Sequence, residues 1–453
     1  MKTLIQKQIQ VAKDVYEFLF ASYSPKTERE ASDAVGFNFL LHWFPVKITK
    51  KSLSWHYSFW LGTISLVLFI ILSLSGIVLI FLYVPSVERA YQSIKDIEFV
   101  VSYGWLIRRM HRWAAHFMVA FVFFHMIRVF LTGAYRSTNV TPQGKRYANW
   151  IIGIVLLVLT LLLSYTGYLL PWDQLALWAI VIGANIAKAT PIIGDQVQFI
   201  MQGGNEIGQN TLILWYAMHI AVLPFIVTAL ISWHMWRIRK DGGLASVDSL
   251  GVKKEGGEPV KSKTYSLMGI AKGVRPSISY HKVAGETVHA IPAVLTRMMI
   301  VTVFTVGFMT FLSIFFAVPL EEPATTEWTP NPAKAPWYFL WLQELVSITT
   351  IRVPLINLGI FSIPPFTING GFLGGAVIPG LVVGAALMWP QFDRSPESAV
   401  GVWFHKSRLK QNIVFLIIVL ALAILTYIGT FMRGPNWGMF LPWESWPSMP
   451  VNF

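Results

Sequence analysis

Long apolar runs alternate with polar segments along most of the chain. Each of seven runs reaches about 20 residues, the length that an α-helix needs to cross the roughly 30 Å hydrocarbon core of a bilayer. The runs lie near residues 58–84, 112–134, 149–171, 211–236, 291–318, 371–390 and 412–432. The pattern predicts an all-α integral membrane protein with seven transmembrane helices.

The polar segments divide the chain into four regions. Residues 1–53 lack the long apolar run and cleavage site of a signal peptide, and we expect an amphipathic segment on the membrane surface. Residues 241–290 contain glycine pairs with scattered Lys and Ser, which predicts a basic cytoplasmic linker. This linker separates a four-helix domain, residues 54–240, from a three-helix domain, residues 291–453.

Charge alternates between successive loops. Loops near residues 136–146, 237–282 and 394–410 are rich in Lys and Arg, and the loops between them are richer in Asp and Glu. The positive-inside rule therefore predicts that the N-terminus lies inside and the C-terminus outside. Two outside loops, residues 172–210 and 319–370, are rich in Trp, Pro and Ile, and we expect them to fold back onto the membrane and build a site.

The composition narrows the possible chemistry. Hydrophobic residues make up 54% of the chain and charged residues 13%, which excludes an ordinary soluble domain. The net charge of +13 in so apolar a chain indicates cytoplasmic loops rather than nucleic-acid binding. The chain contains no Cys, which excludes thiolate-bound zinc, iron–sulfur ligation and thioether-linked haem. Any metal must bind to His, Met or oxygen ligands.

Two predicted spans each carry two widely separated histidines. His111 and His125 are 14 residues apart, within about 40° of one helix face, and His219 and His234 are 15 apart, about 60° off register. A lone membrane histidine is usually a hydrogen-bonded packing residue, but polar side chains in a bilayer need a partner or a task. Two such helices face to face predict two His pairs, each able to bind one planar metal macrocycle. His116, about 140° from His111, is expected to be structural.

The first and third spans contain glycines at the same interval. Gly62 and Gly76 are 14 residues apart, as are Gly153 and Gly167. Glycine lets a flat ring approach the backbone, although small residues also serve close packing of membrane helices. The agreement of four helices on nearly one interval predicts a four-helix bundle with two bis-His haems, whose filled axial positions favour electron transfer.

Several cations lie near the histidines, toward the helix ends. Either they contact haem propionates or they extend to the membrane interface as long basic side chains commonly do. These residues are Arg108, Arg112, Arg128, Arg239 and Lys240.

Three segments carry a family resemblance. HRWAAHFMVAFVFFHMIRVFLTGAY, TGYLLPWDQLALWA and LWYAMHIAVLPFIV resemble the cytochrome b6 branch of the cytochrome b family, the membrane core of Rieske-type quinol oxidoreductases. The three later spans resemble subunit IV, which chloroplasts make as a separate chain. The resemblance covers residues 40–435 and implies a fusion of the two.

The resemblance implies both cofactors and activity. It pairs His111 with His219 for a low-potential haem b near the outside, and His125 with His234 for a haem b near the inside. Quinol would be oxidised at an outer pocket, with one electron passing to a Rieske iron–sulfur protein and the other through both haems to a quinone at an inner pocket. The resemblance thus implies the core subunit of a proton-translocating quinol–cytochrome c oxidoreductase.

The resemblance also implies partners. Because the chain has no Cys, the Rieske cluster would lie on another polypeptide. A c-type cytochrome or plastocyanin-like acceptor would take the electrons onward. A homodimer in the lipid of a bacterial energy-conserving cytoplasmic membrane is the implied setting.

The outer quinol pocket is matched by two short segments. Trp172 and Asp173 of PWDQ, together with Pro336, Trp337 and Tyr338, match its walls. The other interpretation of these residues is an interfacial aromatic belt with a Pro-rich turn.

The sequence departs from the family at two places. Trp60 stands where the chloroplast branch has the Cys that anchors an additional haem, so no thioether-linked haem is expected. Pro336 stands where the family's Pro-Glu-Trp-Tyr motif has the Glu that takes a proton from quinol. Burial against aromatic walls would make Glu344 or Asp173 a substitute general base. Alternatively, Glu344 is an exposed carboxylate on a loop helix.

Two further functions compete with the first. The lost motif Glu leaves open a di-haem membrane anchor of another quinone-linked complex with a modified outer site. A transporter with histidine proton relays would not need the glycine intervals. Copurifying iron–sulfur signals would favour the oxidoreductase over the anchor.

Overall fold

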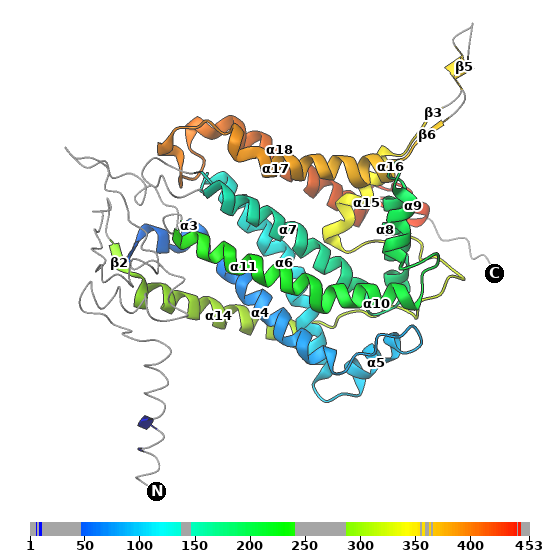
Figure 1. The fold of residues 1–453 in the computed structure, drawn as a ribbon, viewed down its shortest axis with the longest axis horizontal. Helices are drawn as coiled ribbons and strands as arrows, with labels where there is room; N and C mark the ends of the chain where they lie inside the picture. The colour runs from blue at the N-terminus through cyan, green and yellow to red at the C-terminus, as the bar shows by residue number, and fades with distance from the viewer. Residues whose placement is uncertain are drawn as a thin grey trace, which may run out of the picture.

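The computed structural model describes residues 47–136, 146–240, 287–353 and 366–441, with short pieces at 6, 9–10, 356–357, 362–363 and 443–444. These parts are mostly helical, and the long helices run side by side (Figure 1). Most of the expected amphipathic N-terminal segment and most of the predicted linker lie outside the described residues.

Within the described residues, seven helical stretches are long and apolar enough to cross a membrane, which confirms the predicted fold class. The helices that form them, in chain order, are α4 (Leu61–Ile80), α6 (Gly104–Leu131), α7 (Arg146–Leu169), α10 with η3 and α11 (Gln209–Ala217, Met218–Val222 and Leu223–Lys240), α14 (Ala290–Phe315), α16 with η4 and α17 (Gly370–Phe372, Leu373–Val377 and Ile378–Phe392), and α18 (Leu409–Tyr427) with its flanking turns η6 (Lys406–Arg408) and η7 (Ile428–Met432).

The first four spans form one bundle. Helix α4 packs against α6, α6 against α7, and α7 against α11. The later spans flank this bundle on different sides, since α14 packs against α4 and α6 whereas α17 packs against α7. The division between four and three helices in the sequence therefore does not produce two separate bundles in space.

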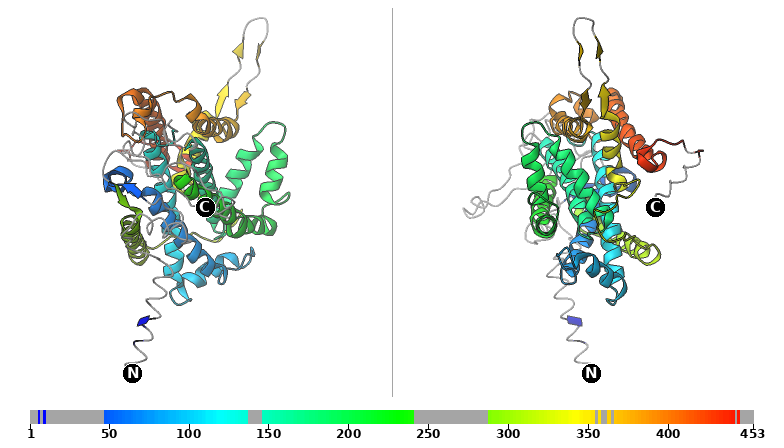
Figure 2. Two further views of the ribbon diagram at one scale, coloured as in Figure 1. Left: turned by 60° about the vertical axis from the view of Figure 1, so that its left-hand side comes forward. Right: turned by 90° about the vertical axis from the view of Figure 1, so that its right-hand side faces the viewer.

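Short helices gather at one end of the bundle. They are α5 (Ala90–Phe99), α8 (Gln174–Lys188), α9 (Gly194–Gln202) and α15 (Trp337–Thr349). Helices α8 and α9 form a hairpin beside the long helices, green in Figure 2. The two long loops predicted to build a site thus supply three of these helices. Asp173, whose carboxylate accepts a hydrogen bond from the Ala176 backbone N–H at 2.9 Å, caps the start of α8.

Short strands and turns complete the fold. The strand β1 (Lys47–Thr49) pairs antiparallel with β2 (Thr287–His289), so the chain before α4 meets the chain before α14. Two further antiparallel pairs, β3 with β6 and β4 with β5, extend between α15 and α16. The remaining elements are η2 (Lys51–Leu53), α3 (Trp55–Ser58), β3 (Ile351–Val353), β4 (Ile356–Asn357), β5 (Ser362–Ile363), β6 (Phe366–Ile368), η5 (Glu397–Ala399) and η8 (Pro435–Trp437).

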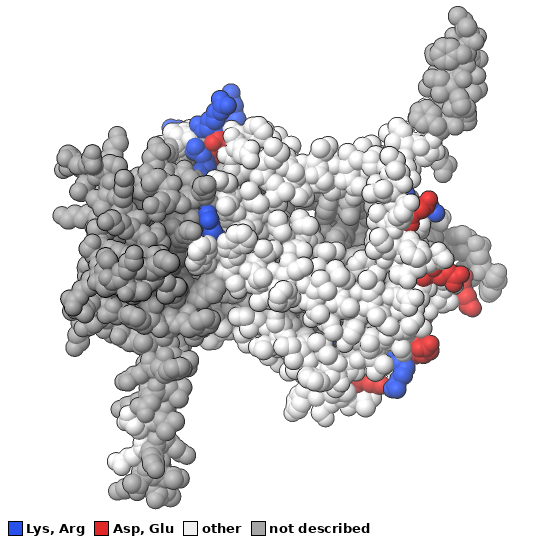
Figure 3. Space-filling model, viewed as in Figure 1, with Lys and Arg blue, Asp and Glu red and all other residues white. Residues whose placement is uncertain are grey.

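The two ends of the bundle differ in charge. The basic end, where α7 and α18 begin, carries Arg136, Arg146, Arg394, Lys406, Arg408 and Lys410. The acidic end, at α5, α8 and α9, carries Glu88, Asp96, Glu98, Asp195, Glu206, Glu321 and Glu322 among its charged residues. On the face shown in Figure 3, blue side chains gather at the first end and most red ones at the second.

A buried polar network joins the early and late helices at the basic end. Arg408 is fully buried and donates hydrogen bonds to the Phe130 carbonyl at 2.8 Å and to the Tyr135 hydroxyl at 2.9 Å. The Tyr135 hydroxyl in turn donates to Asp393 Oδ2 at 2.5 Å. Gly133 has a φ of 61°, and a Cβ there would lie 2.8 Å from the Arg408 guanidinium, so both backbone and space require glycine.

Asp393 is held ionised within this network. Burial alone would raise the pKa of its carboxyl, but hydrogen bonds from Ser395 and Tyr135 and the charge of Arg408, 3.4 Å away, keep that pKa below its usual value. The network therefore pairs a buried anion with a buried cation across α6, α17 and α18.

Replacing Arg408 with Met should destabilise the protein by about 3 kcal/mol, because it leaves the Asp393 carboxylate with only the more distant Arg136 cation, at 3.9 Å. The measurement is the thermal unfolding midpoint of the purified protein in detergent. Lys410→Met, at an exposed position of the same turn, is the matched control. Equal midpoints for the two variants would contradict the role assigned to Arg408.

Candidate functional site

Four histidines form two facing pairs inside the first bundle. His111 on α6 faces His219 on η3, with ring centres 6.3 Å apart and ring planes at 73°. His125 on α6 faces His234 on α11, with ring centres 6.4 Å apart and planes at 81°. We call these the acidic-end pair and the basic-end pair. The structure brings together the pairs that the family resemblance implies.

The separation within each pair fits a metal between the rings. Two metal–imidazole bonds of about 2 Å each, extended by about 1.1 Å from nitrogen to ring centre at either side, span about 6.2 Å, close to the observed 6.3 and 6.4 Å. Among the described residues, no group of three or more His, Asp and Glu gathers to hold a metal ion. Each pair is a candidate to hold a metal between two imidazoles.

The four predicted glycines each face one of these histidines. A Cβ added at Gly167 would lie only 2.5 Å from the His219 ring, and one at Gly153 would lie 3.6 Å from the His234 ring. At Gly62 and Gly76 the distances, to His125 and His111, are 3.2 and 3.3 Å. We predicted that a flat cofactor would lie against these glycines. The structure shows that the edges of the four histidine rings lie against them.

Hydroxyl groups set the tautomer of the acidic-end pair. The Ser75 hydroxyl donates to the Ile71 carbonyl at 2.6 Å, so its oxygen is left to accept from His111 Nδ1 at 2.9 Å. Thr166 likewise donates within its own helix and lies 3.0 Å from His219 Nδ1. With the proton on Nδ1, the Nε2 lone pair of each ring is free to bind iron.

A π-helical turn at His219 explains the unequal histidine spacing. The turn η3 spans Met218–Val222 and contains the ligand. A π turn adds one residue to an α-helix, so an interval of 15 residues there matches an interval of 14 elsewhere. Pro224, just beyond, has no N–H for the Ile220 carbonyl, which favours irregular pairing at this point. The 15-residue interval between His219 and His234 was itself a sign of the π turn in the sequence. A calculation for a regular α-helix instead puts these two histidines about 60° off register.

The predicted propionate cations have other partners in the structure. Arg108 forms a buried ion pair with Glu98 at 2.7 Å, and Arg109 pairs with the same carboxylate at 2.7 Å, so Glu98 is shared between two cations. Arg112 lies over the Tyr168 ring and Arg128 over the Tyr57 ring, at 4.9 and 4.6 Å. Neither has a carboxylate partner among the described residues, so both remain candidates for a propionate.

Arg239 and Trp60 are the other two predicted positions near the cofactor sites. The side chain of Arg239 lies outside the described residues. Trp60, at the position of the chloroplast-branch Cys, is buried with Leu53, Val294 and Val301. Its indole fills a hydrophobic cluster between the start of α4 and α14.

Asp173 lies buried at the acidic end. Besides capping α8, its carboxylate accepts from the Glu321 N–H at 3.4 Å, and the neighbouring Gln174 N–H donates to the Glu322 carbonyl. Burial raises the pKa of Asp173, and the backbone hydrogen bonds and the charge of Arg112 offset part of that rise. The site contains a carboxyl whose proton affinity is higher than usual.

The segment that begins at Pro336 contacts the histidine that we expected to be structural. Pro336 caps α15, and the Trp337 indole N–H donates to His116 Nδ1 at 3.0 Å. Tyr338 is buried and meets the His116 ring edge-on at 5.6 Å. Burial raises the pKa of Tyr338. Sequence reasoning placed His116 off the haem face but gave no sign that it would lie beside this loop.

Glu344 is fully buried and paired with Arg433. The guanidinium holds both carboxylate oxygens, with Nε at 2.9 Å and Nη2 at 2.5 Å. The interpretation of Glu344 as an exposed carboxylate is therefore wrong. Its role as a general base would require it to take a proton beside a bound cation, and the sequence did not identify Arg433 as its partner.

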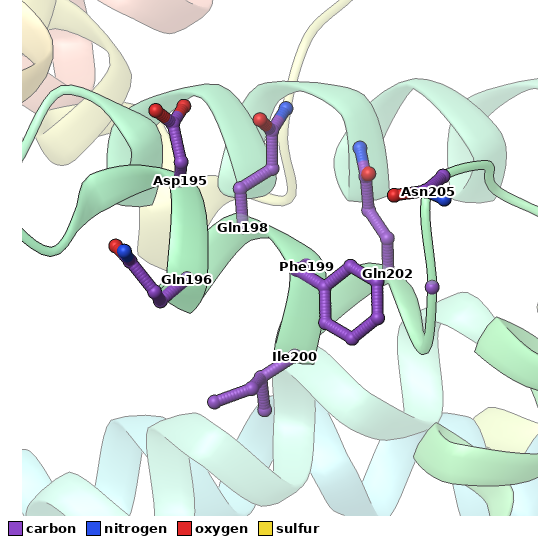
Figure 4. A pocket seen from close by; sticks show the side chains of 8 residues that line it. Asp195, Gln196, Gln198, Phe199, Ile200, Gln202 and Asn205 are labelled. Carbon is purple, nitrogen blue, oxygen red and sulfur yellow. The ribbon is translucent and has the colours of Figure 1, made fainter.

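A surface hollow of about 520 Å³ lies along α9, away from the histidine pairs. Figure 4 shows its lining of glutamine, asparagine and apolar side chains with the single carboxylate of Asp195. None of the four paired histidines lines this hollow.

Comparisons with known proteins identify relatives of the histidine-bearing half. Residues 46–242 match the family described as cytochrome b/b6/petB. Cytochrome b6 of Acaryochloris marina (strain MBIC 11017) is 40% identical over 182 residues, which is 40% of this chain and 81% of that protein. Cytochrome b6 of Synechococcus elongatus is 39% identical over 197 residues, 43% of this chain and 88% of that protein.

A solved structure extends the likeness to the later helices. A chain titled "Hyperthermophilic respiratory Complex III" aligns with a TM-score of 0.63 over 95% of this chain and 91% of its own length. The two are 22% identical, so this similarity establishes a shared fold.

The glycine distances predict a graded response to added methyl groups. Gly167→Ala should cost about 1–3 kcal/mol and disturb the acidic-end pair, because its Cβ would overlap the His219 ring. Gly153→Ala, with ordinary contact at 3.6 Å, should be tolerated. The measurements are the thermal midpoint and the visible absorbance per protein. A larger loss in Gly153→Ala than in Gly167→Ala would contradict the geometry.

Proposed function

Because the chain belongs to the cytochrome b/b6 family, we propose that it is the membrane di-haem cytochrome b subunit of a quinol:cytochrome c oxidoreductase, or of one with a plastocyanin-like acceptor. The observation that carries this proposal is the pair of His–His separations, 6.3 and 6.4 Å, each suited to one metal between two imidazoles. Two haems b, when bound, would supply one-electron transfer.

The chain's own residues would hold and orient these groups. His111 and His219 would bind one iron, and His125 and His234 the other. The glycines opposite them leave space for the rings, and Arg112 and Arg128 would place cations near the propionates. Alignment of both pairs between the same helices keeps them at two depths of one bundle.

The charge difference between the two ends supports an orientation. We place the basic end inside, at the cytoplasmic face of a bacterial energy-conserving membrane, by the positive-inside rule. The chain before α4 then lies inside and the chain after α18 outside. The acidic end, with α8 and α15, would form the outer surface where quinol is oxidised.

At this outer end, we assign Asp173 as the first candidate to accept a proton from quinol. Burial raises its pKa, which brings a carboxyl closer to the range useful for a general base. Tyr338, buried beside His116, would form part of the aromatic wall. Glu344 remains the second candidate, and its ion pair with Arg433 would have to loosen before it could take a proton.

Partners follow from what the chain lacks. With no Cys, it would need a Rieske iron–sulfur protein on another polypeptide to take the first electron. A c-type cytochrome subunit or acceptor would receive it next, and we propose a homodimer surrounded by lipid. The three later spans would correspond to the subunit IV-like part.

A second function is kept open by one observation. Pro336 caps α15 at the position of the motif Glu, and Glu344 is bound by Arg433, so neither offers a free carboxylate. This favours, as the alternative, a di-haem anchor of another quinone-linked complex with a modified outer site. Copurification of a Rieske protein separates the two functions.

Histidine substitution tests the haem sites. Redox-titrated optical and EPR spectra should show two low-spin b haems in the wild type. His125→Ala and His234→Ala should each lose the same one of the two haems. His116→Ala, in the same helix as His125, is the matched control and should keep both. Survival of both haems in the two ligand variants would show that the assignment is wrong.

Asp173→Asn tests the proton acceptor. Asparagine caps a helix about as well as aspartate, so α8 should remain intact while the proton acceptor is lost. We expect quinol oxidation to fall about 100-fold. In the wild type the rate should drop as the pH falls through the raised pKa, because the protonated carboxyl accepts nothing, and the variant should lose that dependence. An unchanged rate and pH profile would transfer the role to another group.

A further inference from the structure

The two histidine pairs differ in what touches the far side of their rings. Each histidine faces a glycine, and the residue before that glycine differs between the two ends. At the acidic-end pair these residues are Ser75 and Thr166, whose hydroxyls reach Nδ1 of the ligands at 2.9 and 3.0 Å. At the basic-end pair they are Leu61 and Ile152, which have no polar atom to offer.

The basic-end pair is correspondingly less satisfied. His234 Nδ1 is buried and has no hydrogen-bond partner in the described part of the chain. The Asn149 carbonyl faces it without meeting hydrogen-bond geometry, and the Leu72 and Leu163 carbonyls likewise face His111 and His219. The backbone carbonyl is therefore common to both ends, and the hydroxyl groups are what distinguish the acidic-end pair. Because Ile152 precedes Gly153 just as Thr166 precedes Gly167, a hydroxyl is missing at an equivalent place.

The direction of each hydroxyl bond decides its electronic effect. Ser75 and Thr166 both donate their own protons to carbonyls of their helices, so each oxygen can only accept from the imidazole N–H. An acceptor at Nδ1–H makes the opposite nitrogen a stronger base. A stronger axial base favours the oxidised, more positive iron and therefore lowers the midpoint potential.

We propose that Ser75 and Thr166 are positioning residues that hold the acidic-end haem at a lower midpoint potential than the basic-end haem. The inference rests on the proposed function and deepens it. An electron delivered at the acidic end would then move energetically downhill toward the basic end. The bias would come from two hydroxyl groups one residue before the glycines, with no change of axial ligand.

The test is a redox titration of the purified complex, followed optically and by EPR, with three variants. Removing an acceptor in Ser75→Ala or Thr166→Val should raise the midpoint of the acidic-end haem by about a tenfold change in its redox equilibrium, or about 59 mV for one electron. The basic-end haem should not move. Ile152→Thr should do the reverse and lower the basic-end midpoint by a similar amount.

Thr160→Val is the matched control, since Thr160 is buried on the same helix as Thr166 and bonds only to its own helix carbonyl. Midpoint potentials that shift equally in this control and in Thr166→Val would overturn the inference. So would midpoint potentials of the two haems that stay unchanged in all three substitutions. Ligand variants assign each midpoint to its pair. A wild type with fewer than two low-spin haems would overturn the proposed function as well, so the two failures are distinguishable.

Discussion

The fold of this protein depends on placing four imidazole rings inside an apolar helical bundle. A buried imidazole without partners is costly in a membrane, and here each ring meets another across a gap that fits a metal. The glycines opposite the rings, the π turn at His219 and the hydroxyls of Ser75 and Thr166 are all consequences of that requirement. Each provides space, register or a hydrogen bond to a histidine.

The buried polar groups have different roles at the two ends of the bundle. At the basic end, Arg408, Tyr135 and Asp393 form a buried ion-paired network that fastens α17 and α18 to the end of α6. At the acidic end, polar groups surround a proposed site of chemistry. Asp173 is buried with its proton affinity raised, and Glu344 is fixed by Arg433.

The four glycine–histidine contacts repeat one arrangement with small differences. The four glycine–histidine contacts share one plan, which suits two similar cofactors. The residue before each glycine breaks that symmetry, because it is a hydroxyl at one end and a hydrocarbon at the other. An inherently symmetric scaffold can in this way support a preferred direction of electron movement.

The sequence by itself determined the seven spans, the four histidines and the matching glycines, because membrane helices must satisfy their own backbone and their period fixes which residues share a face. Only the tertiary structure decided the partners of polar side chains. Arg433 lies 89 residues beyond Glu344, and His116 meets Trp337 221 residues away. Helical periodicity carries no information about such contacts, since they depend on how separate helices pack.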